Sequence, residues 1–302
     1  MTLSQGCQTV SAITPSHHKK TAAEIDKILV VNSNSHVERY RIAEQAFAES
    51  IQGTSYNIID LMNEDDPVGL LQDVLNHGQF EHIYCIGAKA LGSIDYIAPE
   101  QDIVFSSVLN WQRFQGQEGI SGIASDIAPT SQLAMFKHFF PELTSVGVIY
   151  SDTNKARIKQ AVSAAESLGI TLHPVQMEDN DDIDHHIQFL SDQVQALWLI
   201  PDPVVLSSIH TTTQIFELAH QDKLPIFSSN SLFKDLGATL VVSADLPTIG
   251  RQAAILIKNT QQHETQVHYP AGSHIILNMN RTMEYQLELN YQALGSVNEL
   301  IE

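Results

Sequence analysis

Residues 146–175 read VGVIYSDTNKARIKQAVSAAESLGITLHPV, and this stretch decides the fold class. Its first five residues are mostly β-branched or aromatic, which predicts a buried strand that stops at the polar turn of residues 151–154. Residues 155–168 carry apolar side chains at helical spacing, and Gly169 follows at a common helix end. Residues 170–175 predict a second strand. A strand, a helix and a strand in this order are typical of a parallel sheet.

The same alternation of apolar strands and amphipathic helices extends in both directions from this stretch. Further short apolar runs predict strands at residues 28–31, 56–61, 82–86, 103–108, 196–200, 225–227, 238–242 and 274–277. Longer runs predict helices at residues 37–51, 67–76, 129–140, 204–220 and 248–258. Nearly continuous apolar strands indicate parallel sheets that helices cover on both faces. The predicted fold class is therefore α/β, with two Rossmann-like, doubly wound lobes.

The composition excludes several classes of partner. The chain has 302 residues, with 35 acidic and 16 basic side chains and a formal net charge of −19. This balance repels nucleic-acid phosphates and anionic lipid head groups, so it argues against a basic groove for either. Hydrophobic residues make up 43% and charged residues 17%, which is typical of a globular chain and not of a disordered one. The length indicates two domains of roughly 100–150 residues each.

Residues 1–26 are polar and carry no apolar signal-peptide core, so we expect a disordered tail outside the lobes. The run LSQGC at residues 3–7 looks like a blurred lipoprotein cleavage box, which would place a lipid anchor on Cys7. The alternative is an accidental Gly-Cys pair in a polar tail. Cys85 lies in the apolar run IYCI, which predicts a buried, inert thiol. No window approaches the roughly 20 apolar residues that a membrane helix needs.

Motifs for catalysis or cofactor binding are not found in the sequence. There is no Gly-x-Ser-x-Gly elbow, no Walker loop and no Gly-x-Gly-x-x-Gly after the first predicted strand. The 14 histidines include neighbours at His185 and His186, but no Cys/His group has the spacing of metal ligands. We therefore expect no catalytic residues, no metal and no cofactor.

Small polar residues stand at the ends of most of the predicted strands. These clusters lie at residues 32–35, 87–88, 151–154, 201–203, 228–231 and 243–245. Each cluster alone has a simpler explanation as turn or helix-cap residues, but several at one edge predict a pocket, because open α/β sheets bind ligands beyond the carboxyl ends of their strands. Asp202 and Asp245 could each receive a ligand ammonium group. Trp111 could cover an apolar or aromatic ligand, with packing at a lobe edge as the alternative.

The run ALWLIPDPVVL at residues 196–206 is the most specific of an ordered set of motifs. The others lie at residues 119–123, 127–129, 146–151, 224–227, 237–238 and 249–254. With these motifs, residues 119–279 resemble the substrate-binding proteins of a group of bacterial ABC importers, with members linked to aromatic amino acids such as tryptophan. The first half departs in detail: residues 107–111 lack the family's Thr-Asp-Pro turn, and Gly87 is not followed by its Thr. These departures fall where a ligand would be held, which leaves the ligand and the partner open.

The resemblance implies a type I periplasmic-binding fold, in which two lobes joined by three crossovers close over a ligand. Lobe 1 is expected to comprise residues 27–120 and 244–273, and lobe 2 residues 121–243 and 274–302. The crossovers are expected near residues 119–122, 243 and 271–274. The expected ligand contacts, all at strand ends, are Asn34, Ser35, Gly87, Ala88, Asn110, Trp111, Ser151, Asp202, Ser229, Asn230, Ser231 and Asp245.

The function that the resemblance implies is that of the solute-binding component of an ABC import system. Such a protein binds a small, amino-acid-like ligand, aromatic ones included, in the inter-lobe cleft and delivers it to a membrane permease. One alternative keeps the pocket but makes the chain the ligand-sensing periplasmic subunit of a membrane signalling receptor. An enzyme that uses the cleft is a third, with no nucleophile–base pair to support it. The family is exported, which implies a periplasmic or cell-envelope location.

Overall fold

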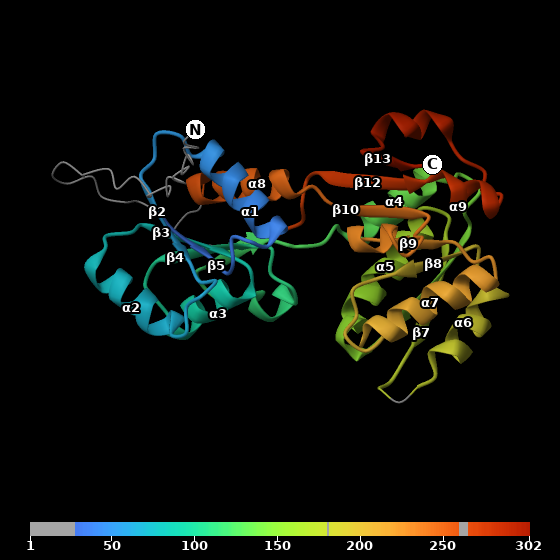
Figure 1. Ribbon diagram of the computed structural model, residues 1–302, viewed down its shortest axis with the longest axis horizontal. Helices are drawn as coiled ribbons and strands as arrows, with labels where there is room; N and C mark the ends of the chain where they lie inside the picture. Colours follow the sequence, from blue (N-terminus) through green and yellow to red (C-terminus); the bar gives the residue numbers. More distant parts are fainter. Residues whose placement is uncertain (1–27, 180, 260–264) are drawn as a thin grey trace, which may run out of the picture.

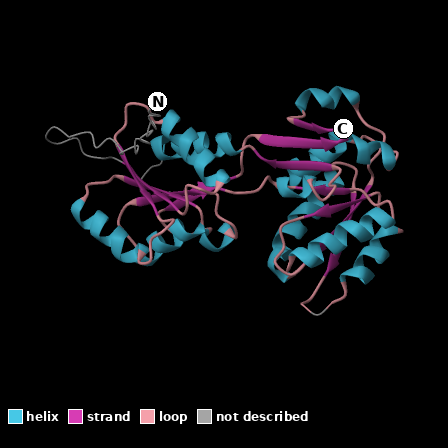
Figure 2. Cartoon of the chain, in the orientation of Figure 1, coloured by secondary structure: helices cyan, strands magenta, loops and turns pink. Residues whose placement is uncertain are grey.

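The computed structural model describes residues 28–179, 181–259 and 265–302, which form two α/β lobes, each built on its own sheet (Figure 1, Figure 2). The sheet of lobe 1 is made of β1 (Ile28–Asn32), β2 (Tyr56–Asp60), β3 (His82–Ile86), β4 (Asp102–Ser106), β5 (Ile120–Ile123) and β11 (Val267–His268). These strands are parallel and lie in the order β11-β5-β4-β3-β1-β2. The central strands are apolar on both sides because both faces of the sheet are covered.

Helices form a layer on each face of this sheet (Figure 1). The elements are α1 (Glu38–Ser50), α2 (Pro67–His77), α3 (Ala88–Ile97), the 3-10 segment η1 (Trp111–Phe114) and α8 (Leu246–Asn259). Side chains alternate between the two faces of a strand, so Val30 and Tyr84 pack against α1 and α8, whereas Leu29 and Cys85 pack on the side of α2 and α3. Cys85 is buried as predicted, and this burial raises the pKa of its thiol.

The sheet of lobe 2 is larger and contains one antiparallel pairing, beyond which two edge strands run opposite to the other five. Its strands are β6 (Ser145–Tyr150), β7 (Thr171–Gln176), β8 (Ala196–Leu199), β9 (Ile226–Ser228), β10 (Leu240–Ala244), β12 (Ser273–Asn278) and β13 (Glu299–Ile301). They lie in the order β13-β12-β10-β9-β8-β6-β7. The pairing of β10 with β12 is antiparallel, and the other pairings are parallel. The α/β class with two doubly wound lobes is confirmed.

Helices also cover both faces of the second sheet. The elements of lobe 2 are α4 (Pro129–Phe139), η2 (Asp152–Asn154), α5 (Lys155–Ser167), α6 (Ile183–Ser191), α7 (Ile209–Gln221), η3 (Ser231–Lys234), α9 (Met279–Glu284) and η4 (Tyr291–Ser296). One core layer packs α4 and α5 against the sheet, and the other packs α6 and α7. Trp198 is fully buried in the first layer, and its Nε1 donates to Gln132 Oε1 at 2.8 Å, so its one polar group is satisfied.

The chain passes between the lobes at three places. The first crossover, residues 124–128, leads from β5 to α4, the second is the β10–α8 junction around Asp245, and the third, residues 269–272, leads from β11 to β12. The first crossover lies later than the expected residues 119–122, because Ile120–Ile123 forms β5 and pairs with β4 on one side and β11 on the other. Lobe 1 therefore extends beyond residue 120 to the end of β5.

Several helices differ from the sequence prediction, and α7 and α3 show why. Helix α7 begins at Ile209 and not at residue 204, because the Asp202 carboxylate accepts hydrogen bonds from the N–H groups of Val204 and Val205 and holds the segment in a turn. Helix α3 was not predicted, since Gly92 at its centre weakens the helical signal.

Some expectations concern residues outside the described ranges. The N-terminal tail and the lipid anchor at Cys7 both lie there. Within the described ranges, the structure contains no helix that combines the length and the apolarity needed to span a membrane. The same residues contain no group of three or more His, Cys, Asp and Glu side chains that could hold a metal ion.

Candidate ligand-binding site

Both sheets turn the carboxyl ends of their parallel strands toward the crossovers. In lobe 1, β5 ends at Ile123 and β11 at His268, where the first and third crossovers start. In lobe 2, β10 ends at Ala244, and antiparallel β12 begins beside it at Ser273. The crossovers therefore run between the strand ends of the two lobes (Figure 1). This is the edge at which open α/β sheets bind ligands.

Four side chains from four different segments meet at this edge, and we call them the junction cluster: Trp111 from η1, Asp126 from the first crossover, Arg157 from the first turn of α5, and Tyr269 from the third crossover. Trp111 Nε1 donates to Asp126 Oδ1 at 3.0 Å, and Arg157 Nη1 donates to Asp126 Oδ2. The Tyr269 ring packs edge-on against Trp111, with 5.9 Å between the ring centroids. One crossover carboxylate thus links an aromatic side chain of lobe 1 to a cation of lobe 2.

The junction cluster is largely removed from water. The side chains of Arg157 and Asp126 are 10% and 13% exposed, so salt screens their ion pair much less than it would a surface pair. Burial raises the pKa of the Tyr269 phenol, the charge of Asp126 raises it further, and the charge of Arg157 opposes this. The phenol is therefore neutral at physiological pH and carries a hydroxyl proton that it can donate.

Several residues near the strand ends hold buried polar atoms without a hydrogen-bond partner among residues 28–179, 181–259 and 265–302, and three of them follow β4, β6 and β9. Arg157 has two, Nε and Nη2, and Ser107 after β4 and Ser229 after β9 each have an unpaired Oγ. Ser107 also has a φ of 57°, which is uncommon for serine. Buried polar groups are normally paired, and unusual backbone conformations often lie at functional sites. These atoms are therefore candidate contacts for a polar ligand.

The predicted residues of lobe 1 do not all lie together. Asn34 and Ser35 lie in the turn after β1, where Asn34 Oδ1 accepts from the N–H two residues on at 2.9 Å and Ser35 N donates to Asp60 Oδ2 at 3.2 Å. Asn110 is exposed and has a φ of 55°, and it directly precedes η1. Among the predicted contacts, Trp111 is the one that the structure places in the junction cluster.

Gly87 and Ala88 form the turn from β3 into α3. Gly87 has a φ of 88°, and a Cβ atom there would lie 2.6 Å from Ser33 Oγ and 2.8 Å from the ring of Tyr40. Ser33 Oγ is held in place because it accepts a hydrogen bond from Ala90 N at 2.9 Å. Glycine at position 87 therefore allows the backbone of this turn to lie close to Ser33 and Tyr40, which follow β1 in the chain.

This geometry leads to a prediction for the Gly87→Ala variant. The new methyl group adds a steric clash with Ser33 to the cost of a positive φ, so we expect a loss of about 2 kcal/mol in the free energy of unfolding. Gly53→Ala is the matched control, since Gly53 has a φ of 87° and its added Cβ would meet nothing within 4 Å. Urea unfolding of both variants measures the difference. Equal losses would show that the contact with Ser33 is unimportant.

In lobe 2, the structure brings Ser151 and Asp202 together. Asp202 is 3% exposed, and its carboxylate accepts five hydrogen bonds, from Ser151 N (2.7 Å) and Oγ (3.0 Å), Asn154 Nδ2 (2.8 Å), Val204 N (3.0 Å) and Val205 N (3.2 Å). Burial raises the pKa of this carboxyl, but the hydrogen bonds outweigh burial and the net pKa lies below the usual value. Because a carboxylate has about four lone-pair sites, the expected ammonium contact finds no free acceptor here. Asp202 instead ties the turn after β8 to the turn after β6.

The remaining predicted residues of lobe 2 and of the second crossover lie in turns and at a helix cap. Asn230 Oδ1 accepts from the N–H two residues on at 3.1 Å, and Ser231 is exposed at the start of η3. Asp245 Oδ2 accepts from Thr248 N at 2.9 Å, from the Thr248 hydroxyl and from Arg251 Nη2 at 3.3 Å. Asp245 is therefore a helix cap at the second crossover, and three donors already contact one of its oxygens.

Sequence reasoning does not identify Asp126, Arg157 or Tyr269, although two of them carry a signal. Asp126 lies between the family-like motifs at residues 119–123 and 127–129, where the chain leaves lobe 1. Arg157 is a cation in the first turn of a helix, where the helix dipole favours acidic side chains. Such an exception indicates a specific partner. Tyr269 stands in a short segment without periodicity, so only its contact with Trp111 reveals it.

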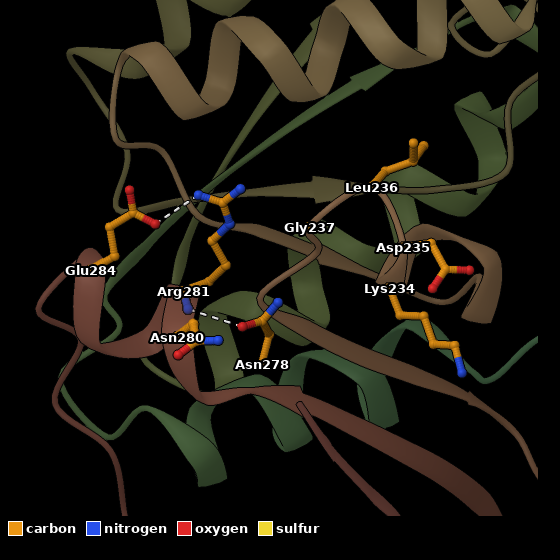
Figure 3. Close-up of a pocket in the computed structure, with 8 residues that line it drawn as sticks. All are labelled: Lys234, Asp235, Leu236, Gly237, Asn278, Asn280, Arg281 and Glu284. Atoms are coloured by element: carbon orange, nitrogen blue, oxygen red, sulfur yellow. Dashed lines mark hydrogen bonds and ion pairs between the residues drawn. The ribbon is translucent and has the colours of Figure 1, made fainter. Parts of the chain in front are cut away.

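A hollow of about 380 Å³ lies elsewhere in lobe 2 (Figure 3). It is lined by Lys234, Asp235, Leu236, Gly237, Asn278, Asn280, Arg281 and Glu284. Asn278 ends β12, whereas the third crossover enters that strand at its other end. Its cations already have partners, because Arg281 pairs with Glu284 at 2.7 Å and Lys234 pairs with a carboxylate of β13 at 2.8 Å. We therefore place the candidate site at the junction cluster and not here.

Two lobes, three crossovers and a site between strand ends define the class of type I periplasmic-binding proteins. An ABC domain in complex with L-Trp from Streptococcus pneumonia aligns with a TM-score of 0.59 at 15% identity, over 91% of this chain and 100% of that one. A ligand-free, open substrate-binding protein with adhesive properties from Clostridium difficile aligns with a TM-score of 0.67 at 14% identity, over 92% and 99%. A conserved domain protein from Vibrio cholerae aligns with a TM-score of 0.59 at 14% identity, over 91% of this chain and 99% of that one.

Residues 100–299 match the family of ABC transporter substrate binding proteins, and the chain belongs to this family. This confirms the resemblance found in the sequence motifs and agrees with the type I periplasmic-binding fold. A comparison with curated protein sequences found no match.

Proposed function

We propose that this protein binds a small, amino-acid-like solute between its lobes and presents it to the permease of an ABC importer, outside the cytoplasmic membrane. The observation that carries the proposal is the junction cluster, in which side chains from both lobes and two crossovers meet at the strand ends. Trp111 and Tyr269 supply aromatic surface for an apolar part of the solute, and Ser107 and Ser229 supply unpaired hydroxyls.

The crossovers explain how binding is communicated to a partner. Each is a short segment between two rigid sheets, and such segments absorb the rotation when lobes close. A solute that contacts both lobes binds the closed form more tightly and shifts the population toward it. A permease that contacts both lobes then recognises the loaded form. As for the rest of the family, the proposed activity is binding and not catalysis.

The proposal predicts that a solute stabilises the protein and makes it more compact. At a concentration of 100 Kd, a ligand specific for the folded state adds about 2.7 kcal/mol to the free energy of unfolding. Thermal melts against a library of amino acids, sugars, nucleosides and amines find the solute, and small-angle X-ray scattering then measures a smaller radius of gyration. If no member of the library shifts the melt or the radius, the proposal is wrong.

Trp111→Ala tests the position of the site. Removal of the indole deletes the aromatic wall and the hydrogen bond to Asp126, so we expect affinity for the solute to fall by at least about 10-fold. Asn280→Ala in the hollow of Figure 3 is the control and is expected to leave the affinity unchanged. Isothermal titration calorimetry on both variants measures this. The reverse pattern would move the site to the hollow.

A further inference from the structure

The strongest unexplained feature of the site is the free edge of Arg157, which we define as its Nε and Nη2 atoms. Both atoms are buried and lack a partner in the described part of the chain, while Nη1 is bound to Asp126. The whole side chain is 10% exposed, so the guanidinium lies largely out of contact with bulk solvent. Unpaired buried donors on a charged group are costly, so this edge calls for a partner that the described residues do not supply.

From this free edge we infer that the solute carries a carboxylate, which Arg157 binds side-on; the inference rests on the function proposed above. The N–H bonds of Nε and Nη2 point the same way and are spaced like the two oxygens of a carboxylate, so the pair is bidentate. A lysine at this position would present a point charge without this match. The free edge therefore specifies a planar, two-oxygen anion.

Asp126 and Trp111 act as positioning residues for this edge. Asp126 binds the opposite corner of the guanidinium, and Trp111 Nε1 fixes the other oxygen of Asp126. The guanidinium is thus oriented before the ligand arrives, which lowers the entropy cost of binding.

The ion pair also limits the charge that the ligand can carry. Arg157 and Asp126 together are neutral, so one added carboxylate leaves a single negative charge, whereas a phosphate dianion would leave two in a poorly solvated site.

The two carboxylates that were predicted as ligand contacts at the strand ends are already occupied. Asp202 accepts five hydrogen bonds from the protein, and three donors contact one oxygen of Asp245. Neither is prepared for a ligand ammonium group in the way that Arg157 is prepared for an anion.

Because the free edge of Arg157 is covered in the present arrangement, ligand entry requires the junction residues to move, which couples carboxylate binding to the hinge.

The chemical test compares each L-amino acid with its amide, in which the carboxylate is replaced and the side chain and ammonium group are kept. Isothermal titration calorimetry measures both compounds on the purified full chain. We expect at least one amino acid to bind, and its amide to bind at least about 100-fold more weakly, because a bidentate, desolvated charge pair is lost.

The residue test uses Arg157→Lys, which keeps a cation beside Asp126 but removes the side-on edge. We expect the melting temperature to stay near that of the wild type, the affinity for the amino acid to fall about 100-fold and the affinity for the amide to stay the same. The double variant Asp126→Asn with Arg157→Gln removes both charges, and it replaces the single variant in this test if Arg157→Lys does not fold. Lys155→Gln is the control, since Lys155 lies in the same helical turn with its side chain 67% exposed.

The outcomes separate this inference from the proposed function. A solute without a carboxylate, or an Arg157→Lys variant that binds the amino acid within threefold of the wild type, overturns the carboxylate inference and leaves the solute-binding function standing. If the amino acids, the amides and the wider library of neutral and cationic compounds all fail to bind, both the inference and the function are wrong.

Discussion

Replacement of Gly250 by valine is expected to lower the free energy of unfolding by about 3 kcal/mol, the upper part of the range for overpacked sites. Gly250 lies in α8 where this helix crosses α1. A Cβ atom there would lie 2.2 Å from Ala43 O, 2.9 Å from Phe47 N and 3.0 Å from Ala46 Cβ. Two of these atoms belong to the backbone of α1, which cannot yield by changing a rotamer. The two helices would have to separate, although they build one face of the lobe 1 core.

Urea unfolding followed by circular dichroism measures this loss. Gly92→Ala is the matched control, because Gly92 is also helical and a Cβ there would meet nothing within 4 Å. Alanine is the better helix former by roughly 1 kcal/mol, so this variant should be as stable as the wild type or slightly more stable. If Gly250→Val unfolds at the same urea concentration as the wild type, the close approach of α1 and α8 is not a feature of the molecule in solution.

The sheets could be predicted because their strands are apolar on both faces and end in polar turns. The limits of lobe 1 could not, since β5 reads as a glycine-rich connection and becomes a strand only through its neighbours β4 and β11. The same distinction applies to the site. Trp111 stands out by its type and position, but Asp126 and Arg157 acquire a role through their contact across 31 positions of sequence. A single sequence does not show which distant polar side chains meet.

Asp202 illustrates the opposite case, in which position predicts a ligand contact and the hydrogen bonds indicate a structural role. We expect Asp202→Asn to lower the free energy of unfolding at neutral pH by about 3 kcal/mol. An amide oxygen can replace one carboxylate oxygen, but the amide NH2 group then faces two or three donors that have lost their acceptor. Asp152→Asn is the control, because the Asp152 side chain is 83% exposed and its pair with Lys155 at 3.6 Å contributes little.

The pH dependence of this loss provides a second readout. The folded pKa of Asp202 lies below its usual value of about 3.9, since the hydrogen bonds outweigh burial and favour the charged form. The stabilisation by the carboxylate is therefore complete above the unfolded pKa and disappears as the pH falls through the lowered folded pKa. The difference between the wild type and Asp202→Asn should thus be constant from pH 8 to about pH 5 and shrink below about pH 4. A difference that persists unchanged into acid would mean that shape, and not charge, makes Asp202 necessary to the two turns that it joins.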